Sequence, residues 1–176
     1  RAETALNTKT MTSPIQCHTL GNGLTVLIQP MPWLRTAALS LNLQAGVHRE
    51  PAHLGGLSSL VCEMIQRGAG QYSSRDLVAA QDNLGIDRNS GVSTAFVSFG
   101  ASMPSDSLPA AISLYADIVR NPHLPHDQLE DARMMAIQEL RAMEDEPTHR
   151  VMRRLRELHY GEVLGRSNFG TETGIQ

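Results

Sequence analysis

The segment from Gly56 to Gly70 reads GLSSLVCEMIQRGAG, and it decides the fold of this chain. Its apolar residues recur at helical spacing, and glycines stand near both ends, where helices commonly stop. We expect a helix that begins at Gly56 and ends near Gly68. The residues expected to form its packing face are Leu57, Leu60, Val61, Met64 and Ile65.

Strand signals precede this helix. Residues 17–28, CHTLGNGLTVLI, place an Asn-Gly turn between two extended pieces, which is a strong hairpin signal. Residues 36–45, TAALSLNLQA, alternate leucine with polar residues, the pattern of a strand with one buried face. A polar connection over residues 47–55 then leads into the helix.

The remainder of the chain adds one expected strand and several helices. Residues 73–76, SSRD, are expected to cap a short helix that ends at Gly85, and residues 92–103 are expected to form a strand. Further helices are expected at residues 108–119, 125–143 and 150–160. The order of elements predicts an α+β fold, a two-layer, mostly antiparallel or mixed β-sheet backed by helices. We expect residues 1–14 to be a flexible leader and residues 15–176 to form a single domain.

Composition excludes several classes of function. Of 176 residues, 41% are hydrophobic and 19% charged, and the net charge of −3 lacks the basic excess typical of nucleic-acid binding. The apolar runs are far shorter than the roughly 18 residues that a membrane span needs. No secretory signal is visible, and the two cysteines form no metal-binding or disulfide spacing. We expect a soluble, cytoplasmic protein with no membrane span and no nucleic-acid partner.

A basic cluster lies in the helix expected at residues 150–160. It consists of Arg150, Arg153, Arg154 and Arg156. A solvated helix face is the favoured interpretation, and an anion site is the alternative.

Six segments in a fixed order resemble one known family. They are LGNGLTVLIQP, LNLQAGVHREP, DNLGIDRNS, YADIVRNP, ARMMAIQELRAMEDEP and GRSNFGTETGI. Together with Gly56–Gly70 they resemble the pitrilysin/insulinase metallopeptidases, which include the mitochondrial processing peptidase subunits. The resemblance implies that residues 15–176 are one half-domain, truncated at its C-terminus or belonging to a longer chain. Family chains are built from two to four such halves.

The resemblance also identifies candidate site residues. In active relatives an HxxEH motif binds zinc through two histidines, its glutamate activates water, and a distant glutamate is the third protein ligand. These positions correspond here to Ser59, Cys62, Glu63 and, for the distant ligand, Glu139. Only Glu139 keeps the family residue, so we expect no catalytic residue, no metal and no cofactor. Asn89 is similar to an asparagine that orients the substrate backbone, although capping its own loop is the competing interpretation.

Three functional hypotheses remain open. The preferred one is a catalytically inactive metallopeptidase homologue, a structural or peptide-binding subunit or domain that pairs with another half or with an active peptidase subunit. The alternative is a metal-dependent peptidase with an altered ligand set of Cys62, Glu63 and Glu139. The third is a free-standing binding module. Self-association of the isolated half into a homodimer is a further expectation, because a surface normally covered by its mate would be exposed.

One more expectation concerns Cys62. A nucleophilic cysteine would need a histidine beside it, and the spacing of the seven histidines places none there. We therefore expect Cys62 to be a buried structural thiol.

Overall fold

A computed structural model describes residues 13–176, which divide into two compact units. One unit ends at Arg35, and the other spans Thr36–Gln176. Most of the leader expected at residues 1–14 lies outside the described residues. The assignment of residues 15–176 to a single half-domain stays a prediction.

The first unit holds the predicted hairpin. Strands β1 (Gln16–Thr19) and β2 (Thr25–Ile28) pair antiparallel, with Gln16 opposite Ile28. The turn forms because Gly23 adopts a positive φ of 85°, which costs glycine little, and the Asn22 side chain accepts the backbone N–H of Leu24 at 3.1 Å. The hairpin prediction is confirmed.

The second unit contains a sheet of three antiparallel strands in the order β3-β5-β4. Strand β3 (Thr36–Leu43) alternates exposed and half-buried residues as its leucine pattern predicts. Strands β4 (Asp87–Val92) and β5 (Val97–Pro104) form a hairpin. The single strand expected at residues 92–103 is wrong at its start: Val92 ends β4, residues 93–96 connect the strands, and β5 begins at Val97. Strand β4 has no counterpart among the expected elements. Its sequence DRNSGV lacks apolar alternation, since β4 is an exposed edge strand.

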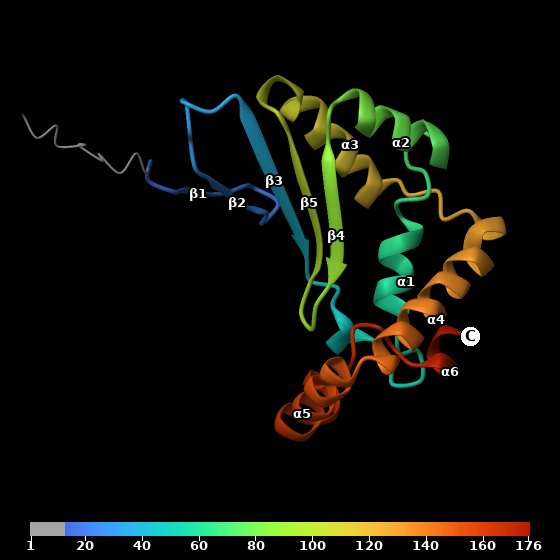
Figure 1. The fold of residues 1–176 in the computed structure, drawn as a ribbon. Helices are drawn as coiled ribbons and strands as arrows, with labels where there is room; N and C mark the ends of the chain where they lie inside the picture. The colour runs from blue at the N-terminus through green and yellow to red at the C-terminus, as the bar shows by residue number, and fades with distance from the viewer. Residues whose placement is uncertain (1–12) are drawn as a thin grey trace, which may run out of the picture. The chain divides into compact units, whose positions relative to one another are not determined.

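Helices cover one face of this sheet (Figure 1). Helix α1 (Leu57–Met64) contacts β4, α2 (Ser74–Asn83) follows it, and α3 (Leu108–Arg120) contacts β3. The cap predicted within residues 73–76 is confirmed and is Ser73, whose side chain accepts the backbone N–H of Asp76 at 3.3 Å.

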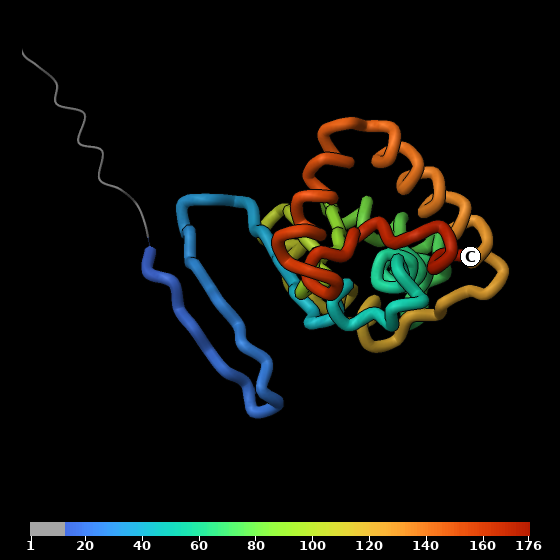
Figure 2. Tube along the Cα trace, turned by 90° about the horizontal axis from the view of Figure 1, so that it is seen from below, coloured from blue at the N-terminus to red at the C-terminus, as the bar shows by residue number. Residues whose placement is uncertain are grey.

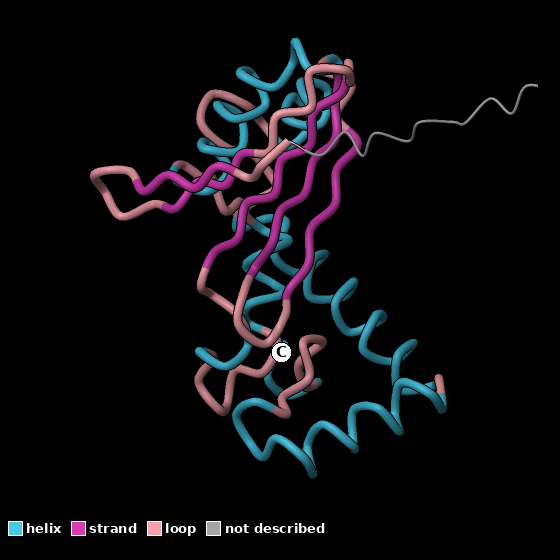
Figure 3. Tube along the Cα trace, turned by 90° about the vertical axis from the view of Figure 1, so that its left-hand side faces the viewer, coloured by secondary structure: helices cyan, strands magenta, loops and turns pink. Residues whose placement is uncertain are grey.

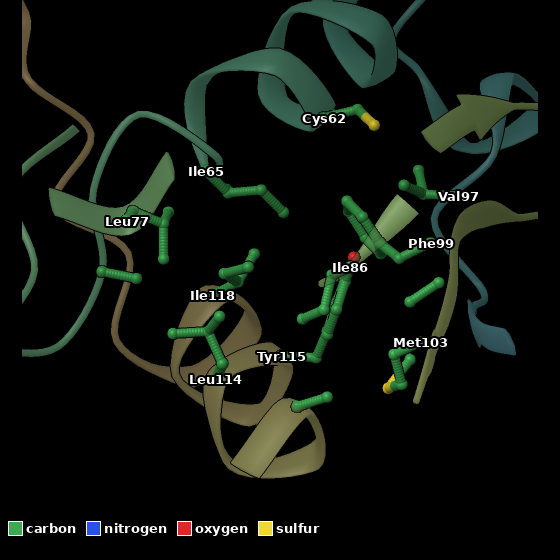
Figure 4. Close-up of a cluster of buried hydrophobic side chains, with 13 residues drawn as sticks. Cys62, Ile65, Leu77, Ile86, Val97, Phe99, Met103, Leu114, Tyr115 and Ile118 are labelled. Carbon is green, nitrogen blue, oxygen red and sulfur yellow. The ribbon is translucent and has the colours of Figure 1, made fainter. Parts of the chain in front are cut away.

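The core lies between the sheet and these helices (Figure 4). Strand β5 presents every second residue to it, beginning with Val97 and Phe99. Helix α3 supplies Leu114, Tyr115 and Ile118, and Cys62 lies at the α1 end of the cluster. Burial of these side chains is the main stabilising contribution.

Two long helices and a C-terminal segment complete the unit. Helix α4 (Leu129–Asp145) and helix α5 (Pro147–Leu164) meet at an angle around Glu146 (Figure 3). Helix α5 has non-helical backbone angles at Gly161. The chain then passes close to the start of α1 and ends in the short helix α6 (Glu172–Ile175), as the view in Figure 2 shows. Single-turn 3-10 helices span Val47–Arg49, Ser105–Ser107 and His126–Gln128.

The α+β fold class is confirmed: helices are combined with two small sheets, and every strand pair in the described residues is antiparallel. None of the helices within residues 13–176 combines the length and the apolar character that crossing a bilayer requires.

Candidate functional site

The start of helix α1 is hydrogen-bonded to the buried carboxylate of Glu50. The Glu50 side chain accepts the backbone N–H of Ser58 at 2.6 Å and that of Gly56 at 3.1 Å. Only 6% of Glu50 is exposed. A helix start leaves N–H groups without intrahelical partners, and a carboxylate is a favourable acceptor there. Glu50 therefore fixes the position of α1 and of the three candidate residues that follow.

The buried face of α1 differs from the one that the apolar pattern predicts. Ser58, Cys62, Met64 and Ile65 are buried, whereas Leu57 is 37% and Val61 44% exposed. The prediction that Leu57 and Val61 form the packing face is wrong. Small side chains at Ser58 and Cys62 let α1 approach its neighbours closely, so the larger residues turn outwards.

A cavity of about 320 Å³ brings the candidate positions together. Ser59, Cys62 and Glu63 line it from α1, and Glu139 lines it from α4. Residues 90–92 of β4 and residues 168–169 also line it, and the rest of its wall is apolar: Leu60, Ala132, Met135 and Ala136. The four positions that the family resemblance identifies thus share one cavity, although they lie far apart in the sequence.

Ser59 is engaged by the C-terminal segment. Its hydroxyl donates to the backbone carbonyl of Asn168 at 2.5 Å. The Asn168 side chain in turn donates to the carbonyl of Val92 at 3.1 Å and so ties this segment to β4. Sequence reasoning missed Asn168 as a site residue. Its only signal was the resemblance of the segment GRSNFGTETGI to the family.

Glu63 forms an ion pair with Arg67, which lies in the bend that follows α1. Arg67 donates from Nε and Nη2 to Glu63 Oε1 at 3.2 and 3.1 Å, and from Nη1 to the carbonyl of Gln128 at 3.3 Å. Most of the Arg67 side chain is buried, with 15% exposed. The Glu63 carboxylate is thus oriented towards a fixed cation.

The Cys62 thiol is part of the core, as expected of a structural thiol. The residue is 5% exposed. Burial raises the pKa of the thiol; a hydrogen bond with the Ser90 side chain lowers this pKa, and the nearby Glu63 charge raises it further. At neutral pH the protonated thiol therefore dominates, whereas both metal ligation and nucleophilic attack require the thiolate.

The two remaining candidates lie on different elements. Glu139 is an exposed residue of α4. Asn89 is in β4, opposite Gly100 of β5, where its side chain occupies the space that a Cβ on Gly100 would need. The interpretation of Asn89 as a loop cap is wrong, because the residue belongs to a strand. Asn89 precedes the three β4 residues that line the cavity and is not among them.

This set of side chains is a poor match for zinc. The hydroxyl of Ser59 is engaged with a carbonyl, the Cys62 thiol is protonated, and Glu63 is paired with Arg67. No imidazole lines the cavity. Within residues 13–176, no cluster of three or more histidine, cysteine, aspartate or glutamate side chains is arranged to hold a metal ion.

Comparison with known proteins identifies relatives of this chain. It is 26% identical over 161 residues to a mitochondrial-processing peptidase subunit beta of Lentinula edodes, covering 91% of this chain and 34% of that protein. It is 23% identical over 159 residues to an uncharacterized zinc protease, YmxG, of Bacillus subtilis, covering 90% of this chain and 39% of that protein. The chain thus spans between a third and two fifths of these relatives.

Solved structures share the fold. A peptidase M16 inactive domain from Pseudomonas fluorescens superimposes with a TM-score of 0.82 at 19% identity, covering 92% of this chain and 40% of that one. Pitrilysin superimposes with a TM-score of 0.82 at 21% identity, covering 96% of this chain and 18% of that one. The model of the insulinase family, peptidase family M16, matches residues 25–172. This chain therefore belongs to the insulinase family of peptidases and is a peptidase-like half-domain.

Proposed function

We propose that this chain is a catalytically inactive half-domain, which binds peptide and pairs with another half of the same family. The observation that carries the proposal is the cavity lined by Ser59, Cys62, Glu63 and Glu139. By the family resemblance this cavity lies where active relatives hold their metal. Here, Ser59 and Glu63 are engaged by other groups, and the Cys62 thiol is protonated at neutral pH.

The chemistry of these positions supports loss of hydrolysis. A zinc peptidase needs three protein ligands, an open coordination position and a general base beside the metal-bound water. Cys62 stands at the position of the base. Its thiol is buried and its pKa is raised, so it is a poor proton acceptor at neutral pH. Loss of a general base alone lowers rates by about 10²–10⁴-fold.

The strand beside the cavity supports peptide binding. Strand β4 is at the edge of its sheet and pairs with β5 alone among the described strands. An edge strand offers unpaired backbone N–H and C=O groups, to which an extended peptide can add as a further strand. Ser90, Gly91 and Val92 of β4 also line the cavity. A peptide on this edge would place its side chains into the cavity, and Asn89 is the residue proposed to contact its backbone.

The exposed surface of helix α5 supports the proposal that the chain pairs with another half. Its side chains at i, i+4 and i+7 form an exposed apolar stripe: Val151 is 66% exposed, Leu155 55% and Leu158 71%. Contiguous apolar surface of this kind marks an interaction site. The proposed occupant is a homologous half, on the same polypeptide or on an active peptidase subunit. When that half is absent, a second copy of this chain is proposed to bind the same stripe and form a homodimer.

One observation keeps the enzymatic alternative as a second candidate. Cys62, Glu63 and Glu139 all line the same cavity, so rotation of the Glu63 side chain away from Arg67 would present two carboxylates and a thiol to a metal. A peptidase with this altered ligand set would be weaker and less selective for zinc than one with two histidines.

Metal analysis separates the two candidates. The purified chain is expected to hold no stoichiometric zinc after incubation with excess zinc and gel filtration, and to cleave none of a mixture of unstructured peptides. One tightly held zinc per chain would sink the proposal. Cleavage that a chelator stops and Glu139→Gln abolishes would establish the enzymatic alternative.

Association is tested with a homologous half that carries an intact HxxEH motif. Size-exclusion chromatography with light scattering should show a complex, which Leu155→Glu/Leu158→Glu weakens. Arg154→Glu, at an exposed polar position of the same helix, is the matched control and should leave it intact. Equal effects of both variants would rule out the apolar stripe as the interface.

The proposed compartment is the cytoplasm. Both cysteines are free, Cys17 being exposed and Cys62 buried, which suits a reducing environment.

A further inference from the structure

A second cavity, of about 200 Å³, lies between α4, α5 and the segment that follows α5. Four arginines line it: Arg150, Arg153 and Arg156 from α5, and Arg166 from the following segment. Glu144 is the one acidic residue in its wall. Arginines from two different elements therefore converge on one hollow of the surface.

Three arginines of the basic cluster of α5 line this cavity, and the fourth lies outside it. Arg154 does not line the cavity and pairs with Glu157 at 3.0 Å. Arg153 is 3.5 Å from Glu144 and 4.0 Å from Glu157. Arg154, which is 69% exposed, belongs to the solvated face. Arg150 and Arg156 are exposed as well, but they differ from Arg154 in that they line the cavity together with the half-buried Arg166.

Part of the positive charge that lines the cavity has no ion-pair partner, although Arg153 pairs with Glu144. Within residues 13–176, Arg150 and Arg156 make no ion pair. Arg166 is half-buried and donates Nη1 to the backbone carbonyl of Glu50 at 2.5 Å, which leaves its other donors available. Like charges repel one another, and an anion in the cavity would relieve that repulsion.

The rest of the wall constrains the ligand. Met152 and Phe169 give the cavity an apolar side next to the guanidinium groups. Asn168 and Phe169 also line the cavity that contains Glu139, so the two cavities adjoin. Arginine binds a carboxylate through two parallel hydrogen bonds, which a planar fork favours.

We propose that this arginine cavity binds a carboxylate carried on an apolar body, the C-terminal group or an acidic side chain of a peptide. The assignment rests on the proposed peptide-binding function for its biological ligand. Its chemistry does not rest on that function, because a small carboxylate can occupy the site by itself. A bound peptide would run from the β4 edge past Asn168, with its negative group held by Arg150, Arg156 and Arg166.

The first experiment uses a probe smaller than a peptide. N-acetylleucine is titrated into the chain while the arginine Nε–H signals are followed by NMR, with N-acetylleucinamide as the uncharged counterpart. The acid should shift these signals saturably, and the amide should not. Arg150→Gln/Arg156→Gln should weaken binding of the acid by about tenfold or more, because charge-assisted hydrogen bonds are lost. Arg154→Gln, on the same helix outside the cavity, should have no effect.

The second experiment locates the source of the carboxylate. Labelled peptides of one sequence are compared as the free acid and as the C-terminal amide, each with and without an internal glutamate. Arg150→Gln/Arg156→Gln should weaken binding only of those peptides whose carboxylate occupies the arginine cavity. If no peptide binds but N-acetylleucine does, the peptide-binding function fails and the anion site stands. Equal binding of the acid and amide probes, or equal losses in the double variant and in Arg154→Gln, would overturn the site.

Discussion

Arg67 holds the carboxylate of Glu63, with its Nη2 3.1 Å from Glu63 Oε1, at the position where the family's second histidine would bind zinc. Glu63 is in the last turn of α1, and Arg67, four positions further along the chain, lies in the bend that follows the helix. Glu63 is 45% exposed, so the pair contributes little to stability. Its importance is positional, because Glu63, which lines the cavity, is held by a cation that is not part of the cavity lining.

This relationship predicts that a metal site can be restored by changing two residues. Ser59→His/Glu63→His places two imidazoles one helical turn apart on the cavity wall, facing Glu139. The double variant should bind zinc in isothermal titration calorimetry, whereas the unaltered chain should not. Adding Glu139→Gln should weaken zinc binding by about tenfold or more, since one of three ligands is lost. If Glu139→Gln left the zinc affinity of the double variant unchanged, α4 would not face α1 in this way.

Glu50 is predicted to be a major stabilising residue outside the core. Glu50→Ala removes both acceptors at the start of α1 and should lower the free energy of unfolding by about 2 kcal/mol or more. Glu50→Gln keeps one oxygen acceptor and should cost less. Urea denaturation followed by circular dichroism measures both changes.

Glu130→Gln is the matched control for Glu50. The Glu130 side chain is 74% exposed and pairs with Arg133 at the surface, so its loss should change stability by less than about 0.5 kcal/mol. If Glu50→Ala cost no more than this control, the carboxylate would not be what fixes α1.

Sequence reasoning succeeded where a local pattern carries the information. The Asn22-Gly23 turn, the leucine alternation of β3 and the Ser73 cap each specify a structure through neighbouring residues. Strand β4 could not be predicted from a local pattern. Its sequence DRNSGV becomes extended by pairing with β5 and has no buried face of its own.

The candidate site shows the same division. Ser59, Cys62, Glu63 and Glu139 could be found from the resemblance to a family, since the spacing survives without the chemistry. The partners that engage them could not be foreseen. Asn168 reaches Ser59 across 109 positions of sequence, and Arg67 could equally well have pointed to solvent.

Cys62 and Cys17 are predicted to differ in reactivity. Cys17 is exposed, whereas burial raises the pKa of the Cys62 thiol. In the native chain at about pH 8.5, iodoacetamide should alkylate Cys17 at least about tenfold faster than Cys62. Mass spectrometry of quenched time points measures both rates, and in denaturant the two should converge. Comparable native rates would mean that the thiol is accessible.

The same thiol gives a direction for the pH dependence of stability. Because the folded pKa is raised, the folded thiol keeps its proton at a pH where the unfolded thiol has lost it. Its contribution to stability is therefore full below the ordinary thiol pKa and is lost as pH rises through the raised value. Cys62→Ala should reduce the decline of stability over this alkaline range, and Cys17→Ser should leave the decline unchanged.

Gly170 is predicted to be required for docking of the C-terminal segment against α1. Its φ is 76°, and a Cβ at this position would overlap the backbone of Gly55 and Gly56. Gly170→Ala combines an unfavourable backbone conformation with a steric clash, and should lower the free energy of unfolding by about 2–4 kcal/mol. Gly91→Ala is the matched control, because a Cβ at Gly91 meets no atom within 4 Å, and should change stability by less than about 1 kcal/mol. The docking also sets the site, since the same segment carries the Asn168 carbonyl that engages Ser59. A Gly170→Ala chain as stable as the control would therefore contradict the close approach of Gly170 to Gly55 and Gly56.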